Sequence, residues 1–355
     1  MTSERKRLSC GDYRVAWICA VANLEQLPAR LMLDEEHTTP QYDTHYDDNA
    51  YICGSISGHA VVIATCPQGK TGNVHSGRLT LPLYKTFRNI SITVLVGIGG
   101  GIPSPAVSSN PRNNIHLGDV VVGWPGDGKP ACVYHDSGRL KAGEPFEMVG
   151  TLQDPNWATL TALGVLETDY RLGKTTFDDQ LARLRQYKTG EEFNYPGFEN
   201  DRLFNPAYRH IGGYSSRCMT CKPSEIIERP HRSAEDQGAI VFHQGRIATG
   251  NSVIQDGTER DKISAQCGGA LCVEMEAAGV SVNGPCLVIR GISDYADSHK
   301  SDLWRVHAAG KAAAFARELL CRVQPAQPAP PAQPIPQHLQ QTAVVKEADA
   351  VTEGQ

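Results

Sequence analysis

The sequence has no apolar run approaching the roughly 20 residues that span a bilayer, so no membrane span is expected. It also lacks a charge excess of one sign, because 34 basic residues stand against 39 acidic ones and the formal net charge is −5. This balance gives no electrostatic case for a nucleic-acid partner. No repeat of solenoid length is visible. What remains is a chain of 355 residues, long enough to bury a core as one large domain or two small ones.

The N-terminus lacks the apolar segment of a signal peptide. Residues 1–7 are polar, and the basic residues among them are better interpreted as a solvated tail than as a nuclear signal. The 11 cysteines are an odd number in a long chain of this kind, which favours reduced thiols over a disulfide framework. We therefore expect a cytoplasmic protein.

Apolar, β-branched runs alternate with helical patterns along the chain, which is typical of an α/β fold. We predict a flexible N-terminus at 1–12, one domain at 13–322 with an insertion at about 189–237, and a disordered Pro/Ala/Gln-rich tail at 323–355. Strands are predicted at 13–20, 50–55, 59–66, 89–96, 117–123, 239–242, 245–250 and 286–291, and helices at about 24–35, 73–84, 160–166, 178–187, 256–266 and 303–321.

The stretch 273–297 is the most informative part of the sequence. An apolar run that ends in a glycine and an acid is typical of a buried parallel strand whose C-terminal end opens into a site. Upstream of it, Glu274 and Glu276 flank Met275, and their side chains are expected to point to opposite sides. One carboxylate can then face a cavity while the other is held inside. Glu276 and Asp294 would then converge on one pocket. The alternative, that both acids merely pair with a cation such as Arg290, stays open on spacing alone.

Four runs of residues carry a resemblance to a known family. Val-Glu-Met-Glu-Ala at 273–277, Ile-Arg-Gly-Ile-Ser-Asp-Tyr-Ala-Asp at 289–297, the segment 247–254 and the glycine-rich 94–101 occur in order. Together they resemble the purine nucleoside phosphorylase and methylthioadenosine/S-adenosylhomocysteine nucleosidase superfamily, nearest to its fungal phosphorylase-like domains. The resemblance implies a single-domain three-layer αβα sandwich with a central mixed sheet, no cofactor, and a homo-oligomer in which a neighbour often completes the pocket.

The resemblance also implies cleavage of an N-glycosidic bond in a purine nucleoside or nucleotide. Asp294 would protonate purine N7, which requires burial to favour the neutral acid. Glu276 would hold the ribose hydroxyls and offset the positive charge of the transition state. Glu25 would act as general base on water, although the turn before it is one residue longer than usual. Its alternative is a first-turn glutamate favoured by the helix dipole.

Other residues are expected to bind substrate. They are Gly97, Gly99, Val253, Ile254, Met275 and Ser293. The glycine amides can approach a ligand closely, the segment at 253–254 would meet the base, and Met275 would pack on the sugar or serve as a plain core residue.

We expect a purine nucleosidase that prefers adenine, because a protonated aspartic acid can donate to N7 and accept from a 6-amino group. Water is the expected acceptor, since Leu95 and Ile98 occupy the places where phosphorolytic relatives carry arginine and serine. A purine nucleoside phosphorylase is the alternative. A catalytically silent ligand-sensing domain is an alternative of another class, and the presence of three acids with distinct chemical roles argues against it.

The predicted insertion contains a single CxxC pair, Cys218 and Cys221, with His210 and His231 on either side. Two thiols and two imidazoles could hold zinc. The irregular spacing and the single CxxC favour a free or loop-stapling thiol pair instead, so no metal is expected.

Overall fold

The computed structural model describes residues 4–186, 190–212 and 218–325. The described residues up to Gln324 form one compact unit. From residue 326 on, the predicted Pro/Ala/Gln-rich tail lies outside the described residues. No described helix combines the length and the apolar character that a membrane crossing requires.

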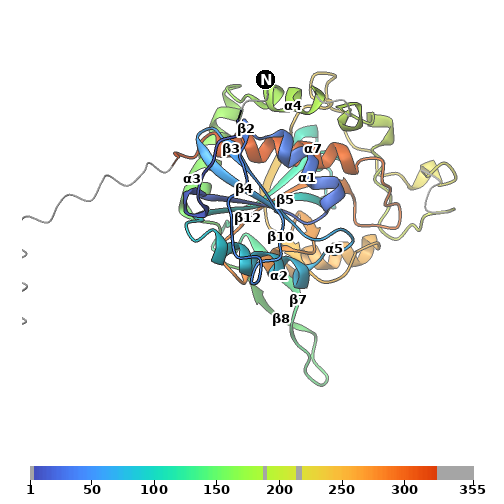
Figure 1. The fold of residues 1–355 in the computed structure, drawn as a ribbon. Helices are drawn as coiled ribbons and strands as arrows, with labels where there is room; N and C mark the ends of the chain where they lie inside the picture. The colour runs from blue at the N-terminus through green and yellow to red at the C-terminus, as the bar shows by residue number, and fades with distance from the viewer. Residues whose placement is uncertain (1–3, 187–189, 213–217, 326–355) are drawn as a thin grey trace, which may run out of the picture. The chain divides into compact units, whose positions relative to one another are not determined.

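A mixed sheet of 12 described strands forms the centre of this unit (Figure 1). Its long central strand β5 (Ile92–Gly101) pairs in parallel with β1 (Val15–Cys19) and with β12 (Leu287–Asp294). The other strands are β2 (Glu35–Glu36), β3 (Tyr51–Ile56), β4 (His59–Thr65), β6 (Val120–Gly123), β7 (Cys132–Arg139), β8 (Glu147–Thr151), β9 (Phe242–Gly245), β10 (Ile247–Thr249) and β11 (Cys272–Glu274).

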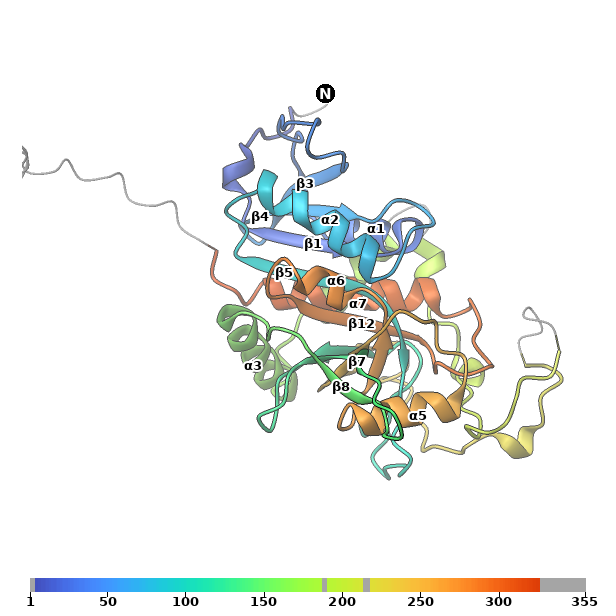
Figure 2. The same cartoon turned by 90° about the horizontal axis from the view of Figure 1, so that it is seen from below.

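The strand order is β2-β3-β4-β1-β5-β11-β10-β7-β8, while β12 pairs with β5 and β6, and β6 pairs with β9. Figure 2 shows β3, β4, β1, β5 and β12 side by side. The antiparallel pairings are β2 with β3, β3 with β4, β5 with β11, β6 with β12, and β7 with β8. The parallel strands β1, β4, β5 and β12 therefore end at the same edge of the sheet, where α/β proteins bind ligands.

Helices cover both faces of the sheet, because the central strands are apolar on both sides. Along β1, Val15 and Trp17 face a core that includes Phe315, whereas Ala16 and Ile18 face a second core that includes leucines of the opposite layer. Figure 1 shows α7 (Arg305–Leu320) and α2 (Asn73–Thr86) on opposite sides of the strands. The remaining helices are α1 (Ala22–Leu31), α3 (Trp157–Arg171), α4 (Phe177–Arg185), α5 (Gly257–Gln266) and α6 (Ala277–Ser281). The predicted three-layer αβα sandwich is thus confirmed.

Several predicted boundaries were wrong. The strand predicted to end at residue 96 continues to Gly101, because β12 and β11 pair with its glycine-rich end. The helix predicted at 24–35 ends at Leu31, since Glu35–Glu36 pairs with β3. Sequence reasoning did not predict α6 or the β7–β8 hairpin. The N-terminal segment predicted to be flexible makes defined contacts where it is described, among them Thr38 N–H donating to the Lys6 carbonyl.

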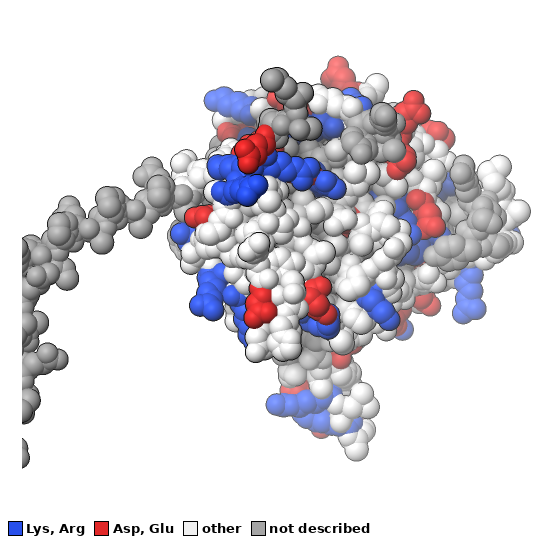
Figure 3. Space-filling view, in the orientation of Figure 1, with Lys and Arg blue, Asp and Glu red and all other residues white. Residues whose placement is uncertain are grey.

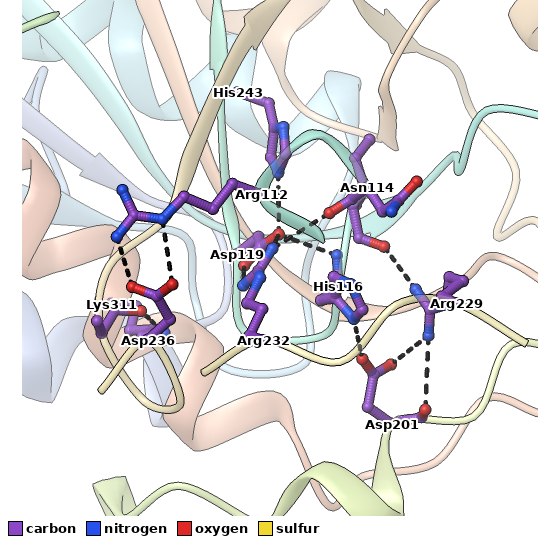
Figure 4. Close-up of polar contacts among 12 residues, drawn as sticks. Arg112, Asn114, His116, Asp119, Asp201, Arg229, Arg232, Asp236, His243 and Lys311 are labelled. Atoms are coloured by element: carbon purple, nitrogen blue, oxygen red, sulfur yellow. Dashed lines mark hydrogen bonds and ion pairs between the residues drawn. The ribbon is translucent and has the colours of Figure 1, made fainter. Parts of the chain in front are cut away.

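Buried ion pairs attach the predicted insertion to the sheet (Figure 4). Asp119 is fully buried and accepts hydrogen bonds from Arg232 and His243. Asp201, within the insertion, accepts from Arg229 at 3.1 Å and lies 2.6 Å from Nδ1 of His116 outside the insertion. Burial alone would raise the pKa of both carboxyls, but these partners outweigh it and hold each pKa below its usual range. On the face drawn in Figure 3, charged side chains of both signs are interspersed with uncharged surface.

Candidate functional site

A cavity of about 230 Å³ opens at the carboxyl edge of the central strands. Eight of the nine residues predicted to react or to bind substrate lie in its wall, and Gly97 does not. The wall is formed by Val21, Glu25, Thr71, Ile98, Gly99, Gly100, His135, Ser252, Val253, Ile254, Val273, Glu274, Met275, Glu276, Arg290, Ser293, Asp294, Ala296, Lys300 and Arg305.

Glu25, on the first turn of α1, reaches into the cavity with its carboxylate held by backbone amides. Oε2 accepts from the N–H groups of Ala20 at 2.7 Å and Val21 at 2.9 Å, while Oε1 accepts from Ile98 N–H at 2.9 Å. Burial raises the pKa of Glu25, and Arg290 and the amides oppose that shift. The longer turn before Glu25 thus serves to bring two amides around its carboxylate.

Gly97 lies beneath the site rather than in its wall. A Cβ atom at this position would collide with the Glu25 carboxylate and with Nη1 of Arg290 at 2.7 Å. The predicted contact between Gly97 and substrate stays a prediction, since two charged side chains fill the space beside its Cα. Its role is to let Glu25 and Arg290 pass close to β5.

Arg290, on β12, is the centre of a buried charge cluster. Its Nη2 donates to Glu274 and, at 3.0 Å, to Oε2 of Glu276, and its Nη1 lies 3.9 Å from Oε1 of Glu25. Burial opposes the charge of Arg290, but the three carboxylates together raise its pKa. The predicted alternation of Glu274 and Glu276 is wrong, since both carboxylates share one guanidinium nitrogen.

Glu276, at the N-cap of α6, accepts a hydrogen bond from a second helix entry with one carboxylate oxygen. Its Oε1 accepts from Gly72 N–H at 3.0 Å, immediately before α2. Gly72 has φ of 95°, which lets the N–H point at the carboxylate. Burial raises the pKa of Glu276 to about 7, although Arg290 opposes it. The glycine-rich entry to α2 therefore receives the protein's own carboxylate, as helix N-termini commonly receive anions.

Asp294 is buried at the end of β12, but it is not an isolated acid. Its Oδ2 accepts from Ser293 Oγ at 2.8 Å and lies 3.0 Å from Nζ of Lys300, while Oδ1 accepts from Ala296 N–H at 3.0 Å. Sequence reasoning missed Lys300, although it follows Asp294 by only six residues. The predicted partner Arg290 is committed to glutamates instead.

The segment predicted to meet the base forms the open side of the cavity. Val253 is 56% exposed although it lines the wall. Asn251 fixes the start of the segment, because its backbone N–H donates to Asp136 at 2.8 Å and its Nδ2 donates to Tyr134 at 2.7 Å. His135, between these two partners, also lines the cavity. The unpredicted strand β7 thus positions the segment that is predicted to meet the base.

Asn73 is a buried residue that sequence reasoning missed. Its Nδ2 donates to the Gly250 carbonyl at 3.0 Å and its Oδ1 accepts from Gly279 N–H at 3.0 Å. Nearby, Ser76 Oγ donates to the Glu276 carbonyl at 2.8 Å. These bonds join α2 to α6 and to the end of β10. The available signal was a polar residue placed directly after a glycine-rich turn.

The four residues of the zinc alternative do not all come together. Side chains of His210, Cys218 and Cys221 form one group, whereas His231 packs against Phe198 with ring centroids 4.3 Å apart. A Cys2His2 site containing His231 is therefore wrong.

The comparisons agree with this architecture. A model of the phosphorylase superfamily matches residues 189–323. A nucleotide-binding leucine-rich repeat (NLR)-like protein of Hyaloscypha variabilis is 35% identical over 322 residues, which are 91% of this chain and 30% of that protein. The chain thus spans about a third of the length of this relative.

Solved structures share the fold at low sequence identity. The 5′-methylthioadenosine/S-adenosylhomocysteine nucleosidase of Neisseria meningitidis, in complex with methylthio-immucillin-A, is 17% identical with a TM-score of 0.51, covering 87% of this chain and 98% of that one. The corresponding Helicobacter pylori nucleosidase, with butyl-thio-DADMe-Immucillin-A, is 16% identical with the same TM-score, covering 87% and 98%. At these identities the likeness establishes the fold alone.

Proposed function

We propose that the protein is a purine nucleosidase that hydrolyses the N-glycosidic bond of adenosine-type nucleosides or nucleotides to free base and ribose. The observation that carries the proposal is the arrangement of Glu25, Glu274 and Glu276 around one guanidinium at the cavity wall. Because three carboxylates surround one cation, the net charge of this part of the wall is negative. Such a wall stabilises an oxocarbenium-like transition state and disfavours a phosphate dianion.

Glu276 and Glu25 have different roles at the sugar. The carboxylate of Glu276, with one oxygen on Gly72 N–H and the other on Arg290, is fixed in place to accept the ribose hydroxyls. Glu25 is the base that takes a proton from the attacking water. Its Oε1 accepts a hydrogen bond from Ile98 N–H. This amide belongs to the glycine-rich end of the strand, and a phosphate would otherwise need it. Water is therefore the proposed acceptor.

Asp294 and Lys300 act at the leaving base. Asp294 delivers a proton to purine N7, and the Lys300 ammonium, 3.0 Å from Oδ2, can supply that proton to the carboxyl group. The second carboxyl oxygen would accept from a 6-amino group, so adenine is the preferred base. The nucleosidases cited above, which bind immucillin-A compounds, support this substrate class.

Two other functions remain as alternatives. A phosphorylase would need a free cation at the sugar, but the guanidinium of Arg290 is already shared among three glutamates. A ligand-sensing domain is favoured by the NLR-like relative, of which the chain spans only 30%. One experiment separates all three.

The test is product analysis with the full chain, using adenosine, 5′-methylthioadenosine and adenine 5′-nucleotides, in buffers with and without phosphate. Chromatography measures adenine, and sugar analysis distinguishes ribose from ribose 1-phosphate. We expect adenine and ribose at the same rate in both buffers. Ribose 1-phosphate formed only with phosphate would establish the phosphorylase. Ligand-induced thermal stabilisation without any adenine release would establish the sensing domain.

A further inference from the structure

The group formed by His210, Cys218 and Cys221 is distinct from the nucleoside cavity described above. Nδ1 of His210 lies 3.3 Å from Sγ of Cys221 and 3.6 Å from Sγ of Cys218. The three potential ligand atoms all lie within 4.8 Å of one another. Two sulfurs therefore converge on one imidazole nitrogen.

These distances match those of a zinc coordination shell. With Zn–S of about 2.3 Å and Zn–N of about 2.0 Å, tetrahedral angles place sulfur and nitrogen ligands about 3.6 Å apart. A dithiol bridge would instead bring the sulfurs of Cys218 and Cys221 into a covalent bond, and both thiols are free in this structure. The histidine gives the thiol pair a third ligand of the kind that Zn²⁺ prefers.

A second observation points to a ligand at the same place. The side chain of His299 is 3% exposed, and neither of its ring nitrogens finds a hydrogen-bond partner within the described part of the chain. Its ring stands at 88° to that of His210 with centroids 5.5 Å apart. A cavity of about 40 Å³ is lined by Cys218 and His299 together. A buried imidazole without partners is costly unless something binds it.

The side chains that contact His299 suit a histidine that binds a metal ion. Its Nδ1 lies 3.7 Å from Oδ1 of Asp297, and the ring is stacked on Phe204 with centroids 3.9 Å apart. A zinc-bound histidine commonly has a carboxylate at its other nitrogen, which fixes the tautomer and leaves Nε2 for the metal. Asp297 and Phe204 would hold the ring of His299 in this role.

We propose a structural Zn²⁺ site formed by Cys218, Cys221 and His210. The imidazole of His299, which lies outside the group of atoms within 4.8 Å, would become the fourth ligand by a shift of its side chain. The first three lie in the segment predicted to be an insertion, while His299 lies on the loop after β12, next to Lys300 and five residues after Asp294 at the end of the strand. The ion would fasten the insertion to the loop that holds the proposed leaving-group acid. The backbone already links these parts, since His210 N–H donates to Ser298 Oγ at 2.9 Å.

The proposal is tested on the full chain, purified with a non-chelating reductant from zinc-supplemented medium and analysed by mass spectrometry for metals. We expect one zinc per chain. Cys218→Ser and Cys221→Ser should lose the ion, and His299→Asn should release it to a chelator at lower concentration than the unmodified protein does. Matched controls are Cys321→Ser, a half-exposed thiol on the last turn after α7, and His231→Asn, which should keep zinc fully.

Because the serine variants could fail to fold, a second measurement uses the unmodified chain. Replacement of zinc by Co²⁺ should give thiolate-to-metal absorption and the visible bands of tetrahedral cobalt. Three results would overturn the proposal: less than a stoichiometric amount of bound metal after zinc loading, a Cys218–Cys221 disulfide in the reduced preparation, or full zinc retention by the Cys218→Ser/Cys221→Ser double variant. Retention of zinc by His299→Asn at unchanged affinity would remove His299 from the site.

Discussion

The 3.0 Å contact between Lys300 and Asp294 determines how a purine base could receive its proton. Asp294→Asn keeps the shape of the carboxyl group but cannot carry the proton. Turnover on adenosine-type substrates should fall by about 10²–10⁴, as for other general acids. Substrate binding should be affected much less than kcat.

The matched variant is Lys300→Met, which keeps the apolar stem and removes only the ammonium. Its kcat should fall as well, while adenine analogues that already carry a proton at N7 should bind it normally. Steady-state kinetics with both variants check this prediction. Near-normal turnover of Asp294→Asn would exclude Asp294 as the acid.

Glu276 is the residue on which sugar recognition depends in the proposed mechanism. Glu276→Gln should reduce kcat/KM for ribosides more than for 2′-deoxyribosides, because the deoxy sugar has already lost part of the contact. The comparison is made with adenosine and 2′-deoxyadenosine under identical conditions. Equal losses on both sugars would show that Glu276 acts only through Arg290 and the cap of α2.

At the scale of the elements, β5 places the site by passing close beneath Glu25. Gly97→Ala introduces a methyl group that meets the Glu25 carboxylate and the Arg290 guanidinium. We expect a loss of about 1–3 kcal/mol in the free energy of unfolding from this overpacking. A large loss of nucleosidase activity should accompany it, because Glu25 is displaced.

The control for this change is Gly164→Ala on α3, where a Cβ would meet nothing within 4 Å. This substitution should stabilise the protein by up to about 1 kcal/mol, since alanine favours helix. Urea denaturation measures both changes. An unchanged activity in Gly97→Ala would mean that the packing of Glu25 against β5 is unimportant.

The sequence predicted the elements that carry the site better than the contacts within it. Apolar runs before Gly291 and after Tyr13 identified β12 and β1, because buried parallel strands are nearly continuous in apolar residues. Strand β5 was predicted to end at Val96, because the glycines that follow have a low strand propensity. In the structure this propensity is overridden by pairing with β11 and β12. Propensity is local, whereas strand pairing depends on segments almost 200 residues away.

The charge cluster shows a similar limit. Spacing placed Glu276 and Asp294 at one cavity, but it could not tell which cation each would meet. Arg290 lies four residues before Asp294 and would share its face on a regular strand, yet it points to the glutamates because the register of β12 shifts between Ile292 and Asp294. Likewise, the proximity of His299 to His210 could not be predicted from the sequence, since the two are brought together only by the fold.

At the scale of the whole molecule, the buried carboxylates Asp119 and Asp201 make stability depend on pH. The pKa of each is lowered in the folded protein, so their contribution is fully present above the ordinary carboxyl pKa of about 3.9 and is lost as pH falls through the lowered values. Unfolding in urea should therefore become easier in strongly acidic buffer.

Asp119→Asn isolates this contribution. It leaves Arg232 with an uncompensated charge and should cost about 3–5 kcal/mol at neutral pH. The difference in unfolding free energy between this variant and the unmodified chain should shrink at low pH. Asp178→Asn, on an exposed turn of α4, is the control and should keep a constant small difference. A pH-independent difference for Asp119→Asn would contradict the assignment.

The burial of Glu276 beside Glu274 and Glu25 has a consequence for the heat of ligand binding. Burial raises the pKa of Glu276 to about 7, so near neutral pH this carboxyl is partly protonated before any ligand arrives. A ligand with a cationic sugar mimic favours the ionised form and should expel a fraction of a proton into the buffer. Calorimetric binding enthalpies measured in Tris and in PIPES should therefore differ near pH 7 and converge at pH 9. A neutral ligand of the same shape should show a smaller buffer dependence, and Glu276→Gln should abolish it.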